Sequence, residues 1–270
     1  MTRRLTIYLA VTFAVTWTFW GMLVPLARAQ RIVYGQGPFM LLYALGGLGP
    51  TIAAYIAVLA TRTQSPIAEF HGRLLRWRLA SSWYLLAMGL PPVLALLSLG
   101  VTVLLHPDSA PPFLARPWYM FIPLFFFMIL GGGLEELGWR GVAQPEMERF
   151  VGRPIAAVLV GLAWSAWHLP LFVLPGVSQY RTNFPIFVIH TIGAALMLVW
   201  LYCHTRSILL CIAFHASMNA TWALGLGNPS TRGSLFLFDA CLGVVVGAVL
   251  LAVNAAPSSR ASGRLAFRKP

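Results

Sequence analysis

The chain has 270 residues, of which 59% are hydrophobic and only 10% are charged, and its mean hydropathy is positive. About a quarter of the residues in a soluble domain are charged, so this composition excludes a soluble protein and indicates an integral membrane protein. The net charge of +12 does not indicate nucleic-acid binding, because the arginines are spread through short loops where anionic lipid headgroups attract them. We therefore expect a lipid bilayer as the partner and no nucleic acid.

Apolar stretches of about 20 residues, long enough to cross a bilayer as helices, predict an all-α, polytopic fold with about eight transmembrane helices. In chain order they span residues 5–27, 38–61, 82–105, 117–134, 154–174, 184–203, 206–226 and 235–254. The fourth and seventh stretches are the least regular, because polar residues interrupt or bound them. Most of the 19 basic residues fall in loops on the side of both termini, so we expect cytoplasmic termini and a location in the cell membrane.

The first stretch resembles a signal peptide, with MTRR before it and the small-residue motif ARA after it. Its apolar core of about 20 residues is longer than the 7–15 residues usual in a signal peptide, and Arg28 lies inside the cleavage motif. We therefore expect a helix that is retained in the protein. Residues 1–270 are expected to form a single membrane domain that ends in a basic cytoplasmic tail at 257–270.

Small residues in the second stretch predict close helix packing; they are Gly46, Gly47, Gly49, Ala53 and Ala54. The polar segment 62–81 that follows predicts a short amphipathic helix along the inner membrane surface.

Polar side chains inside apolar stretches are the informative residues, because membrane energetics make them costly. The whole chain has only seven acidic residues, and four of them cluster: Glu135, Glu136, Glu146 and Glu148. The candidates within or beside the stretches are Glu135, Glu136, His168, His190, His215 and Asn219. A lone intramembrane histidine is usually a packing residue, but three on separate helices beside a carboxylate pair indicate a shared polar cavity.

Helix geometry predicts different roles for the two adjacent glutamates. Glu136 and Arg140 are four residues apart with the acid first, the favourable order for an ion pair, so Glu136 is interpreted as structural. Glu135 points about 100° away and has Trp139, not a base, at its own i+4 position. An unpaired carboxylate in this setting is suited to accept and return a proton.

Two further polar residues, His215 and Asn219, are also four residues apart and would project from one helical face as neighbouring hydrogen-bond donors. Paired donors of this kind can hold the oxyanion that forms on a peptide carbonyl. His168 could help Glu135 to hold and polarise a water molecule. The set therefore predicts amide hydrolysis by activated water.

The three motifs carry a family resemblance. The chain resembles the CPBP intramembrane protease family, also called Abi or CAAX-protease-like. The resemblance rests on three motifs in order: E-E-x-x-x-R starting at Glu135, an aromatic residue and a histidine at Trp164 and His168, and H-x-x-x-N starting at His215. That family includes the Ras-converting CAAX endopeptidases and bacterial relatives linked to bacteriocin maturation or self-immunity. The likeness covers about residues 117–220, and Trp164 stands where the family often has Phe.

The resemblance implies a role for each matching residue. Glu135 would be the general base, His168 would orient the water, and His215 with Asn219 would form the oxyanion site, with Glu136, Arg140 and Trp164 supporting. Zinc bound by Glu135, His168 and His215 is the alternative. We favour a mechanism without a metal cofactor, because the sequence has no H-E-x-x-H motif and an asparagine suits an oxyanion better than zinc.

Two other functions stay open at the level of the sequence. A non-catalytic scaffold or bacteriocin-immunity protein would keep the same residues, and only an activity assay separates it from a protease. A membrane transporter would be favoured by paired inverted repeats or broken helices, and the sequence shows no such symmetry. The expected substrate is a peptide or membrane protein, with a prenylated protein as one option.

Overall fold

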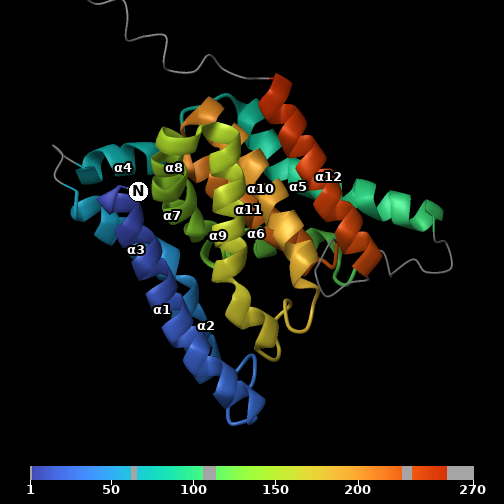
Figure 1. The fold of residues 1–270 in the computed structure, drawn as a ribbon. Coiled ribbons are helices and arrows are strands. Elements are labelled where there is room, and N and C mark those ends of the chain that lie inside the picture. The colour runs from blue at the N-terminus through green and yellow to red at the C-terminus, as the bar shows by residue number, and fades with distance from the viewer. Residues whose placement is uncertain (1, 62–65, 106–113, 227–232, 254–270) are drawn as a thin grey trace, which may run out of the picture.

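The computed structural model describes residues 2–61, 66–105, 114–226 and 233–253 (Figure 1). These ranges contain helices and no β-strand, so the all-α prediction is confirmed. Seven helical segments of the described residues, some of them made of consecutive helices, are long and apolar enough to cross a membrane, and one further apolar helix, Ile208–Ala223, is shorter. The fold is that of a polytopic membrane protein, and the tail predicted at 257–270 lies outside the described residues.

The helices run in the order α1 (Arg3–Arg28), α2 (Gly37–Gly47), α3 (Gly49–Leu59), α4 (Pro66–Leu74), α5 (Ser81–Leu105), α6 (Phe121–Leu130), α7 (Glu136–Gly138), α8 (Gln144–Val151), α9 (Arg153–Trp167), α10 (Phe184–Thr205), α11 (Ile208–Ala223) and α12 (Gly233–Val253). Helices α1 to α3 stand together at one side of the molecule and α12 stands at the other, with α9, α10 and α11 between them (Figure 1). α10 packs against both α9 and α12, and α11 packs against α5 and α6. The motif-bearing helices are thus central.

Glycines allow α1 to pack closely against α2 and α3. A Cβ atom at Gly46 would overlap the ring of Trp20, and one at Gly49 would overlap the hydroxyl of Thr16. Gly47 faces open space instead. The predicted small-residue face therefore exists, but Gly47 is not part of its contact.

The fourth predicted span, 117–134, ends too early. The helical path continues from Trp118 to Val151. It is interrupted after α6, resumes as a 3-10 turn at Gly133–Glu135, and passes through α7 and a π-helical segment at Trp139–Ala143 into α8. The sequence window stopped at 134 because charged residues follow, yet the protein itself buries those residues.

The longer span places Glu135 and His168, which are distant in the sequence, at the same level along the helix axes. The chain turns at Gly152, whose positive φ of 75° suits glycine, and α9 runs back along α8. Glu135 lies 17 residues before this turn and His168 lies 16 residues after it. At about 1.5 Å per helical residue the two positions are level across the hairpin.

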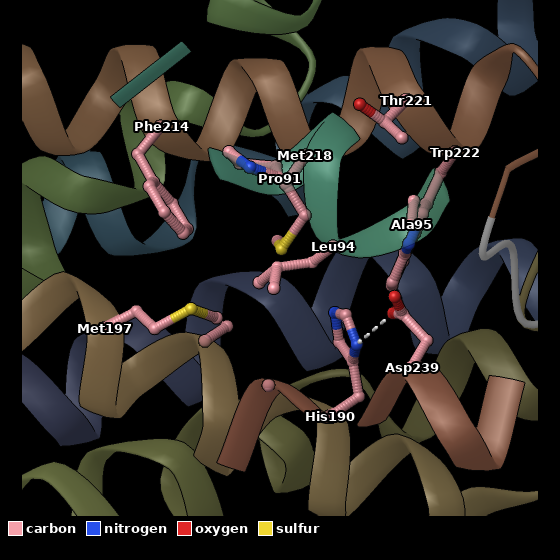
Figure 2. A pocket seen from close by; sticks show the side chains of 12 residues that line it. Pro91, Leu94, Ala95, His190, Met197, Phe214, Met218, Thr221, Trp222 and Asp239 are labelled. Atoms are coloured by element: carbon pink, nitrogen blue, oxygen red, sulfur yellow. Dashed lines mark ion pairs between the residues drawn. The ribbon is translucent and has the colours of Figure 1, made fainter. Parts of the chain in front are cut away.

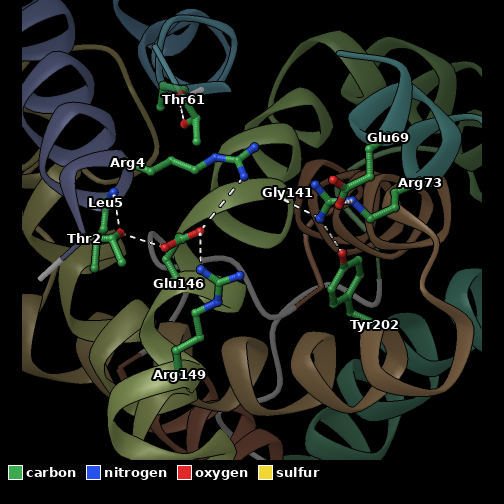
Figure 3. Close-up of polar contacts among 11 residues, drawn as sticks. Thr2, Arg4, Leu5, Thr61, Glu69, Arg73, Gly141, Glu146, Arg149 and Tyr202 are labelled. Atoms are coloured by element: carbon green, nitrogen blue, oxygen red, sulfur yellow. Dashed lines mark hydrogen bonds and ion pairs between the residues drawn. The ribbon is translucent and has the colours of Figure 1, made fainter. Parts of the chain in front are cut away.

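The remaining two clustered carboxylates hold helix ends together, and Figure 3 shows the contacts of the first of them, Glu146. Glu146 accepts a hydrogen bond from the Thr2 hydroxyl at 2.6 Å and lies 4.0 Å from Arg4 Nη1 and 3.6 Å from Arg149 Nη1. Glu148 has a basic partner across the α8–α9 turn. These contacts account for both residues as structure and leave Glu135 and Glu136 as the candidates for chemistry.

Helix α4 forms within the segment predicted to be amphipathic, 62–81, but it packs into the protein. Phe70 is fully buried and occupies the space beside Gly141. Arg73 Nη1 donates to the carbonyl of Gly141 at 3.1 Å and to the hydroxyl of Tyr202 at 2.8 Å (Figure 3). One face of α4 therefore supports the π-helical segment that follows the two glutamates.

Candidate active site

Glu135 ends the 3-10 turn that follows the glycines at 131 and 132. Consecutive glycines disfavour a continuous helix, because glycine loses more backbone freedom than any other residue when it is ordered. The Glu135 side chain is 8% exposed, and Nε1 of Trp164 donates a hydrogen bond to its Oε2 at 2.7 Å. A phenylalanine at position 164 could not donate this bond, so the tryptophan fixes the orientation of the carboxylate.

Glu136 forms the predicted ion pair with Arg140 and also contacts a third residue. Arg140 Nη1 lies 2.9 Å from Oε2 and 3.0 Å from Oε1, and both side chains are fully buried. His215 Nδ1 lies 2.9 Å from the same Oε1. A carboxylate paired with arginine can only accept hydrogen bonds, so Nδ1 carries a hydrogen and donates. Glu136 therefore orients His215 as well as balancing Arg140.

The side chains of His215 and Asn219 converge on the backbone of Gly132. A Cβ atom at Gly132 would lie 3.2 Å from His215 Nε2 and would overlap Nδ2 of Asn219. Both side chains project from one face of α11, as their spacing predicts. The missing side chain at position 132 lets these two polar nitrogen atoms approach the backbone, three residues before Glu135.

Trp164 links the site residues to one another. Its indole N–H binds Glu135, and its backbone carbonyl lies 2.9 Å from Nδ1 of His168. The indole also packs at 5.1 Å from the His215 ring, and the guanidinium of Arg140 lies 5.3 Å from it. The structure therefore brings Glu135, His168, His215 and Arg140 around one tryptophan. Only the aromatic character of this position was used in the sequence interpretation.

Comparison with known proteins identifies this region. Residues 117–221 match the family described as type II CAAX prenyl endopeptidase Rce1-like. Because of this similarity, residues 117–221 are called the Rce1-like domain. A curated relative, CAAX prenyl protease 2 of Methanococcus maripaludis, is 27% identical over 252 residues, which cover 87% of this chain and 92% of the relative.

The Rce1-like domain contains every residue predicted for the site, so the resemblance drawn from three short motifs is confirmed. Together with the apolar helices, it supports an intramembrane endopeptidase of the CAAX protease type. Helices α1 to α5 and α12 lie outside the matched residues.

His190 belongs to a separate polar cluster (Figure 2). Its Nδ1 lies 3.5 Å from Oδ2 of Asp239, and Ser98 Oγ donates to Oδ1 of Asp239 at 3.2 Å. A cavity of about 30 Å³ beside this pair is lined by Phe214 and Met218 of α11, not by the neighbouring His215 and Asn219. The sequence interpretation missed Asp239, although a single carboxylate inside an apolar span is itself a signal.

A zinc ion would need three or more ligands gathered around one point. Among the residues described here, no group of three His, Cys, Asp or Glu side chains is arranged to hold a metal ion. Glu135, His168 and His215 each contact Trp164, through its indole or its backbone carbonyl.

Proposed function

We propose that the chain hydrolyses a peptide bond with a water molecule and without a metal ion. Glu135 takes a proton from the water, His168 holds the water, and His215 with Asn219 stabilises the oxyanion. The observation that carries this proposal is the convergence of His215 Nε2 and Asn219 Nδ2 beside Gly132, next to the oriented Glu135 carboxylate. Preorganised donors beside a base supply two requirements of amide hydrolysis.

In the proposed reaction, Glu135 carries one proton from the water to the leaving amine. The carboxylate accepts a proton from water while the water oxygen bonds to the carbonyl carbon, and the carbonyl oxygen takes up the negative charge. Glu135 then returns the proton to the amide nitrogen as the C–N bond breaks. The products are a carboxylic acid, which keeps the second hydrogen of the water, and an amine. The Trp164 hydrogen bond keeps Oε2 fixed throughout, so Oε1 is the oxygen available for the water.

His168 is supported as the water-holding residue by its own hydrogen bond. Because the carbonyl of Trp164 can only accept, Nδ1 of His168 carries the hydrogen, and Nε2 of the neutral ring is free to accept one from water. His215 has a different requirement. To donate to the oxyanion its Nε2 must carry a hydrogen, so in this role the ring donates to Glu136 through Nδ1 and to the oxyanion through Nε2.

We propose a lipid-modified peptide as the substrate, because the name of the curated relative refers to prenyl proteins. Two matched synthetic peptides test this, one with a prenylated cysteine near its C-terminus and one with the free thiol. The purified protein in lipid is expected to release the residues that follow the cysteine from the prenylated peptide, as measured by mass spectrometry. Equal cleavage of both peptides would contradict the role of the prenyl group.

Failure to cleave either peptide leads to a broader test of the same proposal. Membranes that contain the wild type and membranes that contain Glu135→Gln are compared by proteomics for peptides released only by the wild type. A released peptide supports the protease with a different substrate. Identical peptide profiles would contradict the proposed function and favour a non-catalytic scaffold.

Removal of metal ions by a chelator is expected to leave the rate of peptide release unchanged, because the proposed proton transfer uses Glu135 alone. The measurement is turnover before and after dialysis against a chelator, with the metal content of the active protein determined in parallel. Loss of activity that zinc restores, with one zinc bound per chain and lost in His168→Ala, would overturn the metal-free mechanism. It would leave the peptidase assignment in place.

A further inference from the structure

Helix α1 carries a polar stripe on its buried face, formed by Tyr8, Thr12, Thr16 and Trp20 at intervals of four residues. All four side chains are at most 2% exposed. The stripe lies outside the Rce1-like domain, and no sequence motif marks it. Polar side chains buried in a membrane protein are costly, so their partners indicate what they are used for.

Thr16 joins α1 to the segment that carries His168. Nε1 of Trp167 donates to the Thr16 hydroxyl at 2.7 Å, and this hydroxyl donates to the carbonyl of Gly46 at 2.7 Å. The hydroxyl hydrogen is thereby committed to Gly46, and the oxygen is left as the acceptor for the indole. One buried threonine thus connects α1, α2 and the end of α9.

Trp167 is held by α1 at two further points. The ring of Trp20 packs against it with centroids 4.8 Å apart, and Nε1 of Trp17 donates to its backbone carbonyl at 3.2 Å. Trp167 is the last residue of α9, where the helix would otherwise be free to fray. The position of this indole is therefore set by α1 as much as by its own helix.

Trp167 in turn forms part of the environment of the His168 ring. The two rings meet edge to face with centroids 4.5 Å apart, and Phe187 packs against the imidazole at 5.0 Å. The Nδ1 atom is held by the carbonyl of Trp164. The tilt of the ring about that bond depends on the aromatic neighbours, so a displaced Trp167 would move Nε2, the atom proposed to hold the water.

We propose that Thr16 is a positioning residue for His168 and that it acts through the hydrogen bond to the Trp167 indole. The inference rests on the water-holding role proposed for His168. Thr16 itself contacts neither the substrate nor the reacting atoms. Misplacement of a reacting group by about 1 Å can slow a reaction about 10²-fold, so a bond this far from the chemistry can still control the rate.

Two variants remove the bond from opposite ends. Thr16→Val removes the hydroxyl, whereas Trp167→Phe removes the indole N–H and leaves the bond from Thr16 to Gly46 in place. Each is expected to lower kcat by about 10- to 100-fold with KM unchanged. The double variant is expected to be no slower than the slower single variant, because both remove the same interaction.

Two conservative changes serve as controls. Thr16→Ser keeps the hydroxyl and is expected to retain most of the wild-type kcat. Thr18→Val removes a hydroxyl that is exposed two residues further along the same helix, and it is expected to have no effect. If Thr16→Ser is as slow as Thr16→Val, the methyl packing and not the hydrogen bond is responsible, and the proposal is overturned.

A spectroscopic measurement tests the same inference without an assay of turnover. Histidine labelled with ¹⁵N gives imidazole resonances, and those of His168 are assigned by their loss in His168→Gln. Thr16→Val, which leaves the Trp167 ring unchanged, is expected to shift the His168 resonances and to leave those of His71 unchanged. Unchanged His168 resonances in a folded variant would overturn the proposal. A wild type that cleaves no peptide would contradict the proposed function. The resonances would still show whether the Thr16–Trp167 hydrogen bond positions the His168 ring.

Discussion

Glu135→Gln is expected to lower kcat by about 10⁴-fold in a protein that folds normally, because general acid and base catalysis both depend on this one carboxylate. Glutamine keeps the length of the side chain, and its carbonyl oxygen can still accept the Nε1 hydrogen of Trp164. The amide cannot take a proton from water and return it to the leaving amine. Single-turnover release of peptide at saturating substrate measures the effect.

Glu148→Gln is the matched control for this result. Glu148 belongs to the same cluster of acids in the sequence, but its partners are Gln144 and Arg153 at the end of the bundle. Its replacement is expected to leave kcat at the wild-type value. Turnover near the wild-type rate in Glu135→Gln, with thermal unfolding unchanged, would contradict the general-base role.

The neighbouring variant Glu136→Gln is expected to differ from Glu135→Gln in its stability. Arg140 would lose the charged partner of a fully buried pair, which costs about 3–5 kcal/mol when one member is removed. The spacing of the two residues predicts only this loss of stability. The contact with His215 adds a fall in turnover, because Nδ1 would lose its carboxylate. Equal stability of the two glutamate variants would contradict this division of roles.

The local parts of this site could be predicted from the sequence, because helical spacing alone fixes them. Glu136 with Arg140, and His215 with Asn219, are each four residues apart, and both pairs share a helical face in the structure. The apolar stretches likewise predicted the membrane-spanning helices, since their length follows from the thickness of a bilayer.

The contacts between distant segments could not be predicted in this way. His215 and Glu136 are 79 positions apart, and Trp164 and Glu135 are 29 apart, so no periodicity connects them. The apolar window of the fourth span, 117–134, ended too early for a related physical reason. A charged residue such as Arg140 lowers the mean hydropathy of a window and so ends the predicted span. In the protein, Arg140 is completely buried and paired with Glu136. Paired charges can continue a span that an apolar window would end.

Asn219→Ala is expected to lower kcat by about 10²–10³-fold with little change in KM, because an oxyanion donor acts mainly in the transition state. The carboxamide Nδ2 lies close to the backbone of Gly132, as does Nε2 of His215. Alanine leaves His215 in place as the remaining donor, so some turnover should persist. Initial rates over a range of peptide concentrations separate kcat from KM.

A second variant changes the backbone position, Gly132, on which the His215 and Asn219 side chains converge. Gly132→Ala would place a Cβ atom 3.2 Å from Nε2 of His215 and in collision with the Asn219 side chain, so that the oxyanion could not occupy the position between the two donors. Gly131→Ala, one residue earlier, is the control, because its added Cβ would meet only Met128 and the carbonyl of Phe127. If the convergence of the two nitrogen atoms forms the oxyanion site, Gly132→Ala should lower kcat at least as far as Asn219→Ala, and Gly131→Ala should not. Wild-type kcat in both Asn219→Ala and Gly132→Ala would place the oxyanion elsewhere and would remove the observation on which the proposed mechanism rests.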